Sequence, residues 1–477
     1  MRILFIVPNP PSLVRVRPYN LIKQLLRLGH EVTVATLWTN EEERADIEIL
    51  KQQYGVDVIS MYLPPWRSLW NCLYTLPSTT PLQAVYCWQP KLAHALLNAH
   101  RRSPFDIIHV EHLRGARYGL FLLRMMLQKK VLPESLLSLS PRQMRLGYTA
   151  LREQSQIGMI PAFPPLVWDS VDCISHLFEQ SAKNSRSLKG RLMAALDMKR
   201  TRRHEGWLVY QFDGVLVTST KDKAALQTLA REATAMANHS SGKAANNPFG
   251  GAQDNSKGHY YSNTNINVLP NGVALDYFTA TDEPREPATL VISGKMSYHA
   301  NVTAALHLVQ DIMPHVWAQR PDVEVQIVGK DPPRDVLSLA SSVSAARTQG
   351  GVTVTGTVPD IRPYLRRATI SVVPLIYGAG IQNKVLEAMG CGTPVVATPL
   401  AASGLAGDAI AGRHLMVAEG AEALAQALLA LLSDPARRAQ IGQAGRAYVE
   451  RHHSWEAIGA QLAAFYKTTI ANRNDEA

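Results

Sequence analysis

Hydrophobic runs and helical periodicities alternate along this chain and predict two α/β halves. Short runs of apolar and β-branched residues predict strands in the first half at residues 2–7, 31–36, 105–112, 167–173 and 212–219. Further strands are predicted in the second half at residues 289–293, 323–328, 352–358, 370–375 and 393–398. Helical patterns such as 18–28 and 301–319 lie between them. This alternation is typical of parallel, right-handed, doubly wound sheets.

A polar stretch lies between the two halves. Residues 236–264 are rich in Asn, Ser, Gly and Lys and lack a periodic apolar face, so a mobile insertion or loop is expected there. The chain then leads into the second half, and we place the boundary near residue 280. The expected organisation is an N-terminal domain at 1–280, a C-terminal domain at 281–455 and a terminal helix at 456–477.

Composition narrows the class of protein. Hydrophobic residues make up 46% and charged residues 18% of the 477 residues, which is typical of a soluble globular protein of two domains. No run reaches the roughly 18 consecutive apolar residues of a spanning helix. The apolar N-terminus stops at Pro8 without a cleavage site, so no signal peptide is expected. The four cysteines show no metal or disulfide spacing, which favours a reducing cytoplasm.

The net charge of +10 is unevenly distributed. Residues 1–160 contain 19 Lys and Arg against 11 Asp and Glu, whereas residues 281–477 contain 17 against 18. A basic first half suits an anionic membrane surface, a phosphorylated lipid acceptor or nucleic acid, and a solvated surface without a partner is the alternative. Nucleic acid ranks lowest because no recognised binding motif accompanies the charge. We therefore expect no nucleic acid, and a peripheral position on the inner face of the plasma membrane.

The stretch Ser371–Pro399 carries the clearest chemistry. It predicts a strand, a glycine turn, a short helix and a second strand, with the turn at the carboxyl end of a strand, where open α/β sheets bind ligands. Gly378 and Gly380 allow a ligand to approach the backbone, and the next helix directs N–H groups toward anions. Lys384 and Glu387 share one helix face, so a cation for a diphosphate and a carboxylate for sugar hydroxyls would lie together. The alternative is a structural turn with a surface ion pair.

The sequence GIQNKVLEAMGCGTPVVAT, from Gly380 to Thr398, closely resembles the donor-binding segment of retaining, family 4 type glycosyltransferases, also called glycosyl transferases group 1. The resemblance extends to bacterial polysaccharide-biosynthesis sugar transferases. It implies the GT-B fold, in which two Rossmann-like domains face a cleft and a terminal helix crosses back to the N-terminal domain. It also implies transfer of a hexosyl group from a nucleotide-diphosphate sugar to a carbohydrate or lipid-linked acceptor, with retention and without a metal or other cofactor. In that mechanism the departing phosphate helps deprotonate the acceptor.

The resemblance also implies roles for single residues. Glu387 would contact the ribose, and Lys295 and Lys384 would serve the donor phosphates. The donor-binding set would comprise Gly294, Gly329, Gly378, Gly380, Ile381, Gln382 and Asn383. Two positions depart from the family pattern: an alanine, Ala379, replaces the first of two glutamates, and Asn301 stands where a second positive group is usual.

On the first half, polar residues at two strand ends are the acceptor-side candidates. Glu111 and His112 end the predicted strand 105–112, and His112 is the closest match to a histidine that the family often has there. Arg15 and Arg17 occupy the first loop, where the family commonly has glycines. The sequence leaves both a surface position and an anion-binding role open for these two arginines, and both a structural and a catalytic role open for His112.

Two other functions fit the same pattern. A nucleotide-sugar epimerase shares the fold and acts without an acceptor. A catalytically weakened scaffold protein would explain Ala379 and Asn301. Glycoside hydrolysis by two carboxylates is set aside, because the sequence does not show that any pair of acids converges.

Overall fold

The computed structural model describes residues 1–12, 15–128, 163–176, 178–179, 188–241, 265–378, 381–405 and 409–475. The chain forms two compact units. The first contains Met1–Ser175, Asp197–Leu269 and Gly459–Ala477, and the second contains His176–Leu196 and Pro270–Ile458. The division near Leu269 lies slightly before the position near residue 280 at which the sequence predicts a boundary.

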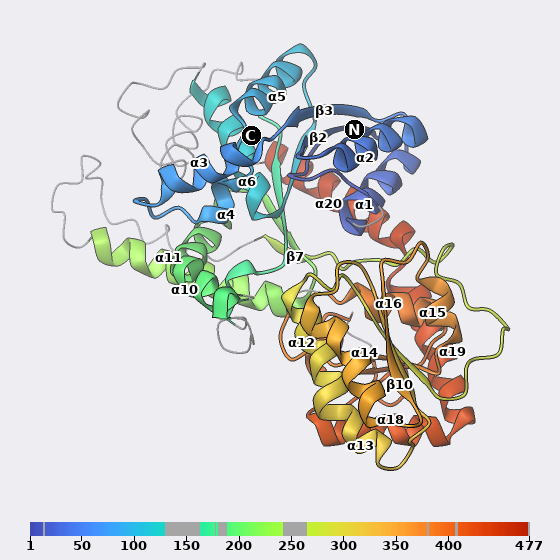
Figure 1. The fold of residues 1–477 in the computed structure, drawn as a ribbon. Coiled ribbons are helices and arrows are strands. Elements are labelled where there is room, and N and C mark those ends of the chain that lie inside the picture. Colours follow the sequence, from blue (N-terminus) through green and yellow to red (C-terminus); the bar gives the residue numbers. More distant parts are fainter. Residues whose placement is uncertain are drawn as a thin grey trace. The chain divides into compact units, whose positions relative to one another are not determined.

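The first unit contains a seven-stranded sheet in which every pair is parallel (Figure 1). Its order is β3-β2-β1-β4-β5-β6-β7. The strands are β1 (Arg2–Ile6), β2 (Glu31–Trp38), β3 (Asp57–Tyr62), β4 (Ile107–Glu111), β5 (Leu166–Val171), β6 (Gly214–Val217) and β7 (Ile266–Val268). The strand order reverses between β1 and β4, so the loops after these two strands flank a topological switch point.

Helices connect these strands, except for the last helix, which returns to this unit from the end of the chain. They are α1 (Val16–Arg27), α2 (Glu41–Tyr54), α3 (Pro65–Thr75), α4 (Leu82–Tyr86), α5 (Pro90–Arg102), α6 (His112–Gln128), α10 (Leu188–Leu208), α11 (Thr220–Ser241) and α20 (Trp455–Asp475). Helix α11 continues to Ser241, so the expectation of a loop from residue 236 is wrong at its start. The helix formers Ala235, Met236 and Ala237 favour this extension. Residues 242–264 lie outside the described part of the chain.

The second unit repeats the same topology with a six-stranded parallel sheet, ordered β10-β9-β8-β11-β12-β13. Its strands are β8 (Thr289–Ser293), β9 (Glu324–Val328), β10 (Gly351–Gly356), β11 (Ile370–Val373), β12 (Val395–Ala397) and β13 (Met416–Val417). Here the order reverses between β8 and β11. The predicted fold class, α/β with two Rossmann-like parallel sheets, is therefore confirmed.

The helices of the second unit surround this sheet (Figure 1). They are α12 (His299–His307), α13 (Met313–Trp317), α14 (Arg334–Ala346), α15 (Arg362–Arg367), α16 (Asn383–Gly390), α17 (Pro399–Ala402), α18 (Ala421–Ser433) and α19 (Pro435–His452). A π-helical segment, Leu308–Ile312, separates α12 from α13, so the predicted helix 301–319 is not uniform. Pro314 explains the change of register, because proline has no N–H to donate to the preceding turn.

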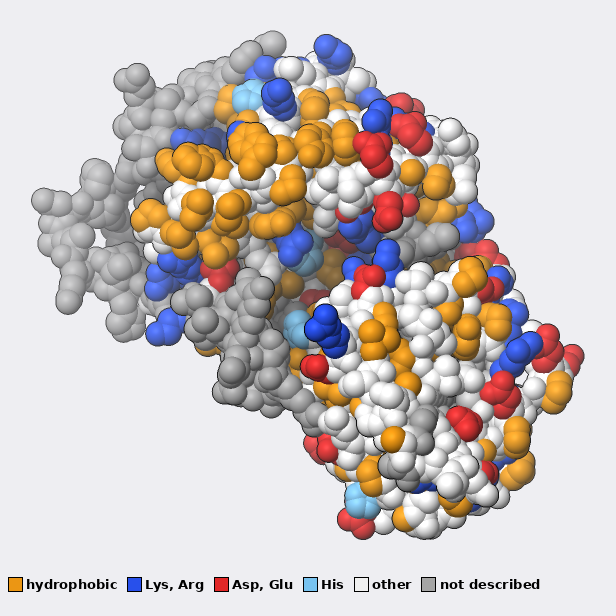
Figure 2. Space-filling view, viewed as in Figure 1, with side chains coloured by type: hydrophobic (Ala, Val, Ile, Leu, Met, Phe, Trp, Pro, Cys, Tyr) orange, Lys and Arg blue, Asp and Glu red, His pale blue; other side chains and the backbone are white. Residues whose placement is uncertain are grey.

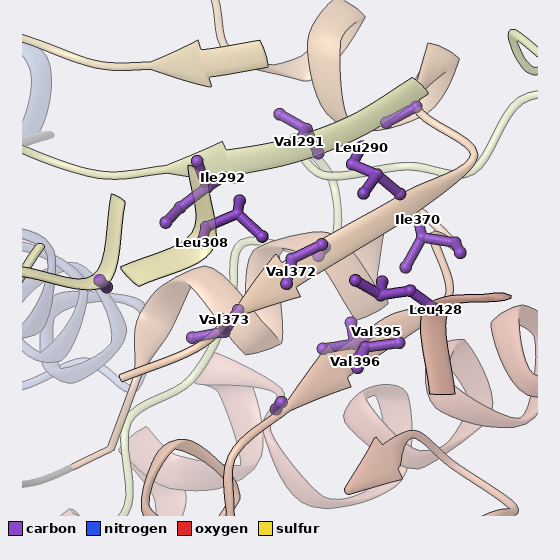
Figure 3. Close-up of a cluster of buried hydrophobic side chains, with 14 of the residues drawn as sticks. Leu290, Val291, Ile292, Leu308, Ile370, Val372, Val373, Val395, Val396 and Leu428 are labelled. Atoms are coloured by element: carbon purple, nitrogen blue, oxygen red, sulfur yellow. The ribbon is translucent and has the colours of Figure 1, made fainter. Parts of the chain in front are cut away.

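The core of the second unit lies on both faces of its sheet. All residues of β8, β11 and β12 are buried, as expected for parallel strands covered by helices on both sides. Figure 3 shows side chains of these strands packed against Leu308 and Leu428, which come from different helical segments. This packing fixes the carboxyl ends of β8 and β11 beside each other.

Two features complete the first unit. The part of α20 that follows Gly459 packs against α1 so closely that a Cβ at Gly459 would overlap Gln24.

Glu205 of α10 is fully buried and its carboxylate accepts hydrogen bonds from the N–H groups of Ile174 and Ser175, at 2.8 and 2.9 Å. The side chain of Glu205 therefore points into the interior of this unit. Among the described helices, none has the length and apolar content needed to cross a membrane.

Candidate functional site

The switch point of the second sheet gathers most of the residues predicted to bind a donor. The loop after β8 begins at Gly294, and the loop after β11 contains Tyr377 and Gly378. These strands are neighbours, since Ile370 pairs with Leu290 and Ser371 with Val291. The loops therefore emerge side by side at the sheet edge where open α/β sheets bind ligands.

Gly294 and Gly329 hold the loop after β8 and the loop after β9 together. The Gly294 N–H donates to the Val328 carbonyl at 3.0 Å, and the Met296 N–H donates to the Lys330 carbonyl at 2.8 Å. Gly294 and Gly329 have φ values of 145° and 155°, which residues with a side chain rarely adopt. A Cβ at Gly329 would overlap the Gly294 carbonyl group. The glycine at 329 is thus required by packing, whether or not it also contacts a donor.

Gly329→Ala is expected to lower the free energy of unfolding by about 2–3 kcal/mol, through backbone strain and the overlap with Gly294. Gly356→Ala is the matched control, because Gly356 also has a positive φ, 68°, but has open space around its Cα. This control variant measures the effect of backbone strain alone, which should lower the free energy of unfolding by about 1 kcal/mol. Urea unfolding of both variants measures the difference, and equal losses would contradict the packing argument.

Lys384 and Asn301 form the polar centre of this edge. Lys384 Nζ donates to Asn301 Oδ1, and Asn301 Nδ2 donates to the Lys295 carbonyl at 2.9 Å. The two residues come from α16 and α12, and Lys295 follows β8. The uncharged residue at position 301 therefore orients the ammonium group of Lys384 toward the loop after β8.

The ionisation of Lys384 and Glu387 is shifted toward the neutral forms. Burial lowers the pKa of Lys384 to about 8, and the nearby Glu387 charge opposes that shift. Burial raises the pKa of Glu387 to about 7, against the influence of Lys384. Both side chains are half-buried rather than fully exposed. Ionisable groups whose pKa values are shifted to near neutral pH, at the edge of a sheet, are typical of functional sites.

The turn before α16 is only partly described. Gly380 and Ala379 lie outside the described residues. Ile381 is buried, and Gln382 is the N-cap residue but gives the helix no side-chain hydrogen bond. Asn383 Oδ1 accepts a hydrogen bond from Asn271 Nδ2 at 3.0 Å. In the described part of the chain the N-cap side chain of α16 makes no capping hydrogen bond, which suits a helix N-terminus that binds an anion.

His299 and Tyr377 were missed by the sequence analysis. Their rings are stacked, with centroids 5.3 Å apart, and His299 Nδ1 lies 2.8 Å from the Tyr377 hydroxyl. Thr303 Oγ1 lies 3.3 Å from the same hydroxyl. Because Tyr377 precedes Gly378, these contacts attach the glycine turn to α12. The only signal in the sequence is the position of Tyr377 next to the turn.

Lys295 and Gly378 lie at the same sheet edge. The Lys295 side chain is exposed, one residue after Gly294. A Cβ at Gly378 would lie 3.6 Å from the Gln382 side chain, which is an ordinary van der Waals contact. The roles expected of these two residues in donor binding therefore stay predictions.

The switch point of the first sheet contains a buried charge network. Arg17 is 4% exposed, and its guanidinium binds Asp169 Oδ2 through Nε at 2.9 Å and Nη2 at 2.8 Å. Arg17 Nη1 also donates to the Leu269 carbonyl at 3.0 Å. His109 Nε2 lies 3.7 Å from the same Asp169 oxygen, and His109 Nδ1 lies 2.8 Å from the Tyr466 hydroxyl. The surface interpretation of Arg17 is therefore wrong, because a buried carboxylate 152 residues away pairs with it.

The other acceptor-side candidates lie beside this network. Burial, followed by the charge of Asp169, raises the pKa of Glu111 to about 8. Burial lowers the pKa of His112 to about 3, so its imidazole is neutral at pH 7. His112 starts α6 with a φ of 63°, a strained conformation often found at functional sites. Arg15 pairs with Glu43 at 2.6 Å, and its side chain is 35% exposed.

Comparison with known proteins shows that this chain is similar to glycosyltransferases. Residues 287–434 match the family model described as glycosyl transferases group 1. The chain is 33% identical over 227 residues to a GDP-mannose-dependent monoacylated alpha-(1-6)-phosphatidylinositol monomannoside mannosyltransferase of Corynebacterium glutamicum. That match covers 43% of this chain and 57% of the relative, so the chain spans about half the length of the curated relative.

Solved structures match over nearly the whole chain. Sucrose-phosphate synthase from Thermosynechococcus elongatus has a TM-score of 0.60 at 18% identity and covers 99% of both chains. HepE from Anabaena, in complex with UDP and glucose, has a TM-score of 0.60 at 15% identity, covering 98% of this chain and 99% of that one. At these identities the likeness concerns the fold.

Proposed function

Because residues 287–434 match glycosyl transferases group 1, we propose that this chain transfers a sugar from a nucleotide-diphosphate donor to an acceptor hydroxyl, with retention of configuration. The observation that carries the proposal is the arrangement at the β8–β11 switch point. There an oriented ammonium group, a carboxyl group and the N-terminus of a helix occupy one sheet edge. This combination suits a diphosphate joined to a polyhydroxylated sugar.

The residues of the second unit would act on the leaving group. The bond between the anomeric carbon and the diphosphate breaks, the acceptor oxygen forms the new bond on the same face, and the acceptor proton passes to the departing phosphate. Lys384, Lys295 and the start of α16 would stabilise the charge that develops on the diphosphate. Glu387 would hold the ribose hydroxyls. The reaction proposed here needs no metal or other cofactor.

For the acceptor, we propose a lipid-linked or carbohydrate molecule bound by the first unit. The Corynebacterium relative is described as acting on a phosphatidylinositol monomannoside, which is a glycolipid. The basic excess within residues 1–160 supports a phosphorylated acceptor at an anionic membrane. His112, Glu111 and Arg15 are the candidates on this side. The corresponding process is glycolipid or polysaccharide biosynthesis, with the chain placed peripherally on the cytoplasmic face.

A panel of UDP, GDP, ADP and dTDP sugars tests the proposal. Thermal stabilisation by one donor, with release of nucleotide diphosphate that depends on a lipid extract, is the expected result; a hundredfold excess over Kd adds about 2.7 kcal/mol. NMR of the product reports the anomeric configuration. Isomerisation of the donor alone would establish the epimerase instead. Binding without turnover across all acceptors would establish a scaffold, and absence of any stabilisation would exclude the donor site.

Donor affinity is expected to weaken above pH 8. The pKa of Lys384 is about 8 in the free protein, so at higher pH its neutral amine must take up a proton when the diphosphate binds. The Kd should therefore rise by up to about tenfold per pH unit above pH 8. Calorimetric titration between pH 7 and 10 measures this slope. Lys384→Met should bind weakly with no slope. Glu387→Gln should keep the slope, because Glu387, with a pKa of about 7, is already ionised above pH 8.

A further inference from the structure

Helix α3 (Pro65–Thr75) exposes the side chains that a globular protein normally buries. Trp66, Leu69, Trp70, Leu73 and Tyr74 are 64%, 61%, 62%, 50% and 81% exposed. Their spacing is i, i+3, i+4, i+7 and i+8, which places all five on one face of the helix. In a surface helix this is the stripe that faces the core. Here the stripe faces outward.

The opposite face of α3 is small and polar, and this is the face that packs on the protein. Ser68 and Thr75 are buried. Asn71 Nδ2 donates to the Trp88 carbonyl at 2.9 Å, and Thr75 Oγ1 donates to the Asn71 carbonyl at 2.7 Å. The bond from Asn71 ties the helix to the first unit, whereas the bond between Thr75 and Asn71 lies within α3. The buried side chains of Ser68 and Thr75 complete the contact. Its large apolar side chains remain exposed to solvent.

The apolar surface extends beyond α3. Tyr62, Leu76 and Tyr86 are also exposed, and they lie at the end of β3, after α3 and on α4. In Figure 2 hydrophobic side chains gather over the part of the first unit where Figure 1 places α3 and α4. We call the exposed residues Tyr62, Trp66, Leu69, Trp70, Leu73, Tyr74, Leu76 and Tyr86 the aromatic patch. Large exposed apolar patches mark interaction sites.

Cationic side chains border the aromatic patch. Arg200 of α10 donates to the Leu76 carbonyl at 2.7 Å, which places α10 at the carboxyl end of α3. The same helix carries Lys199 and Arg203 with exposed side chains. The guanidinium of Arg114 lies 5.4 Å from the centre of the Tyr86 ring. The border is therefore suited to negatively charged groups.

We infer that the aromatic patch docks in the headgroup region of an anionic lipid bilayer. Trp and Tyr concentrate at that depth because their rings are apolar while their N–H and O–H groups remain hydrated. Leu69 and Leu73 would reach the acyl boundary, and the cations of α10 would meet anionic headgroups. A helix of 11 residues is too short to span a bilayer, so α3 would lie in the plane of the membrane.

This inference concerns a surface separate from the sheet edge at β8 and β11. It deepens the proposed function in one respect and rests on it there: a lipid-linked acceptor would be met at the surface on which α3 docks. Docking itself requires no donor and no transfer, so the two proposals are tested independently.

Sedimentation of the full chain with vesicles tests the inference. We expect binding to equimolar phosphatidylcholine and phosphatidylglycerol vesicles, and much weaker binding to phosphatidylcholine alone or at high salt. Leu69→Ser should lower the partition coefficient about tenfold, because one inserted apolar side chain is lost. Leu337→Ser is the matched control: Leu337 is an exposed leucine, 48%, on helix α14 of the second unit. It should bind as the unchanged chain does.

Three outcomes would overturn the inference. They are failure of the full chain to bind anionic vesicles, equal binding by the Leu69→Ser and Leu337→Ser variants, and a dimer in sedimentation velocity that Leu69→Ser dissociates. The second result would mean that another part of the chain covers the aromatic patch. The third would identify it as an interface between copies. Lys199→Gln with Arg203→Gln should reduce binding only to the anionic vesicles, which separates the electrostatic part from insertion.

Discussion

Replacing Lys384 with alanine is expected to lower kcat about 10²–10³-fold, because a positioned donor to the developing charge is typically worth about 2.7–4 kcal/mol. The ammonium of Lys384 is held by Asn301, which is itself bound to the Lys295 carbonyl. Its position is therefore fixed before a donor arrives. The measurement is the initial rate of nucleotide-diphosphate release, with the donor and acceptor identified by the panel.

Two further variants give this prediction its controls. Lys91→Ala removes an exposed lysine from α5 and should leave the rate unchanged. Asn301→Asp places a carboxylate beside the Lys384 ammonium and should raise the pKa of Lys384, moving the onset of the pH dependence of donor affinity above pH 8. A Lys384→Ala rate within threefold of the unchanged protein would show that Lys384 is not part of the catalytic site.

Arg17→Met is expected to destabilise the first unit by about 3–5 kcal/mol, because Asp169 would remain buried without its counter-ion. Asp169 is fully buried, and the pKa of the nearby Glu111 is already raised to about 8 by burial and by the Asp169 charge. Because the chain has two units, we would measure local stability by hydrogen exchange at β4 and β5 rather than a single unfolding transition.

The neighbouring arginine is the matched control for Arg17. Arg15→Met breaks the partly exposed pair with Glu43, which should cost about 0–1 kcal/mol. The double variant Arg17→Met with Asp169→Leu should recover much of the loss, since no buried charge then remains. The loss in Arg17→Met should also be smaller at pH 5 than at pH 8, because protonation removes the unpaired charge. A loss as small as that of Arg15→Met would contradict the role assigned to the network.

The strands of the second unit were the most predictable elements. Thr289–Ser293 was predicted to the residue, because a fully buried parallel strand is a continuous apolar run bounded by a glycine. The predicted strand 370–375 ends earlier, at Val373, since Pro374 cannot donate to the ladder. Strand β3 was missed because it lies at the sheet edge and most of its residues are only partly buried, so its pattern is weak.

The contacts of the site were less predictable than its position. The glycine turn and Lys384 were found from local sequence, but Asn301 and Lys384 are 83 positions apart and their contact depends on how α12 and α16 pack. Arg17 and Asp169 meet for the same kind of reason. Helix α3 shows the opposite difficulty: its apolar stripe is visible in the sequence, yet periodicity alone cannot say that the stripe faces outward.

The return of α20 to the first unit has a consequence for synthesis on the ribosome. Phe465 packs against Gly214, where a Cβ would lie 2.5 Å from the ring, and Tyr466 contacts His109. The first sheet emerges early, but these partners are translated only after residues 270–458, which takes roughly 10–40 s at about 5–20 residues per second. During that interval the surface that α20 will cover is open to nascent-chain chaperones. The second unit, by contrast, has most of its residues within one uninterrupted stretch of the chain, Pro270–Ile458.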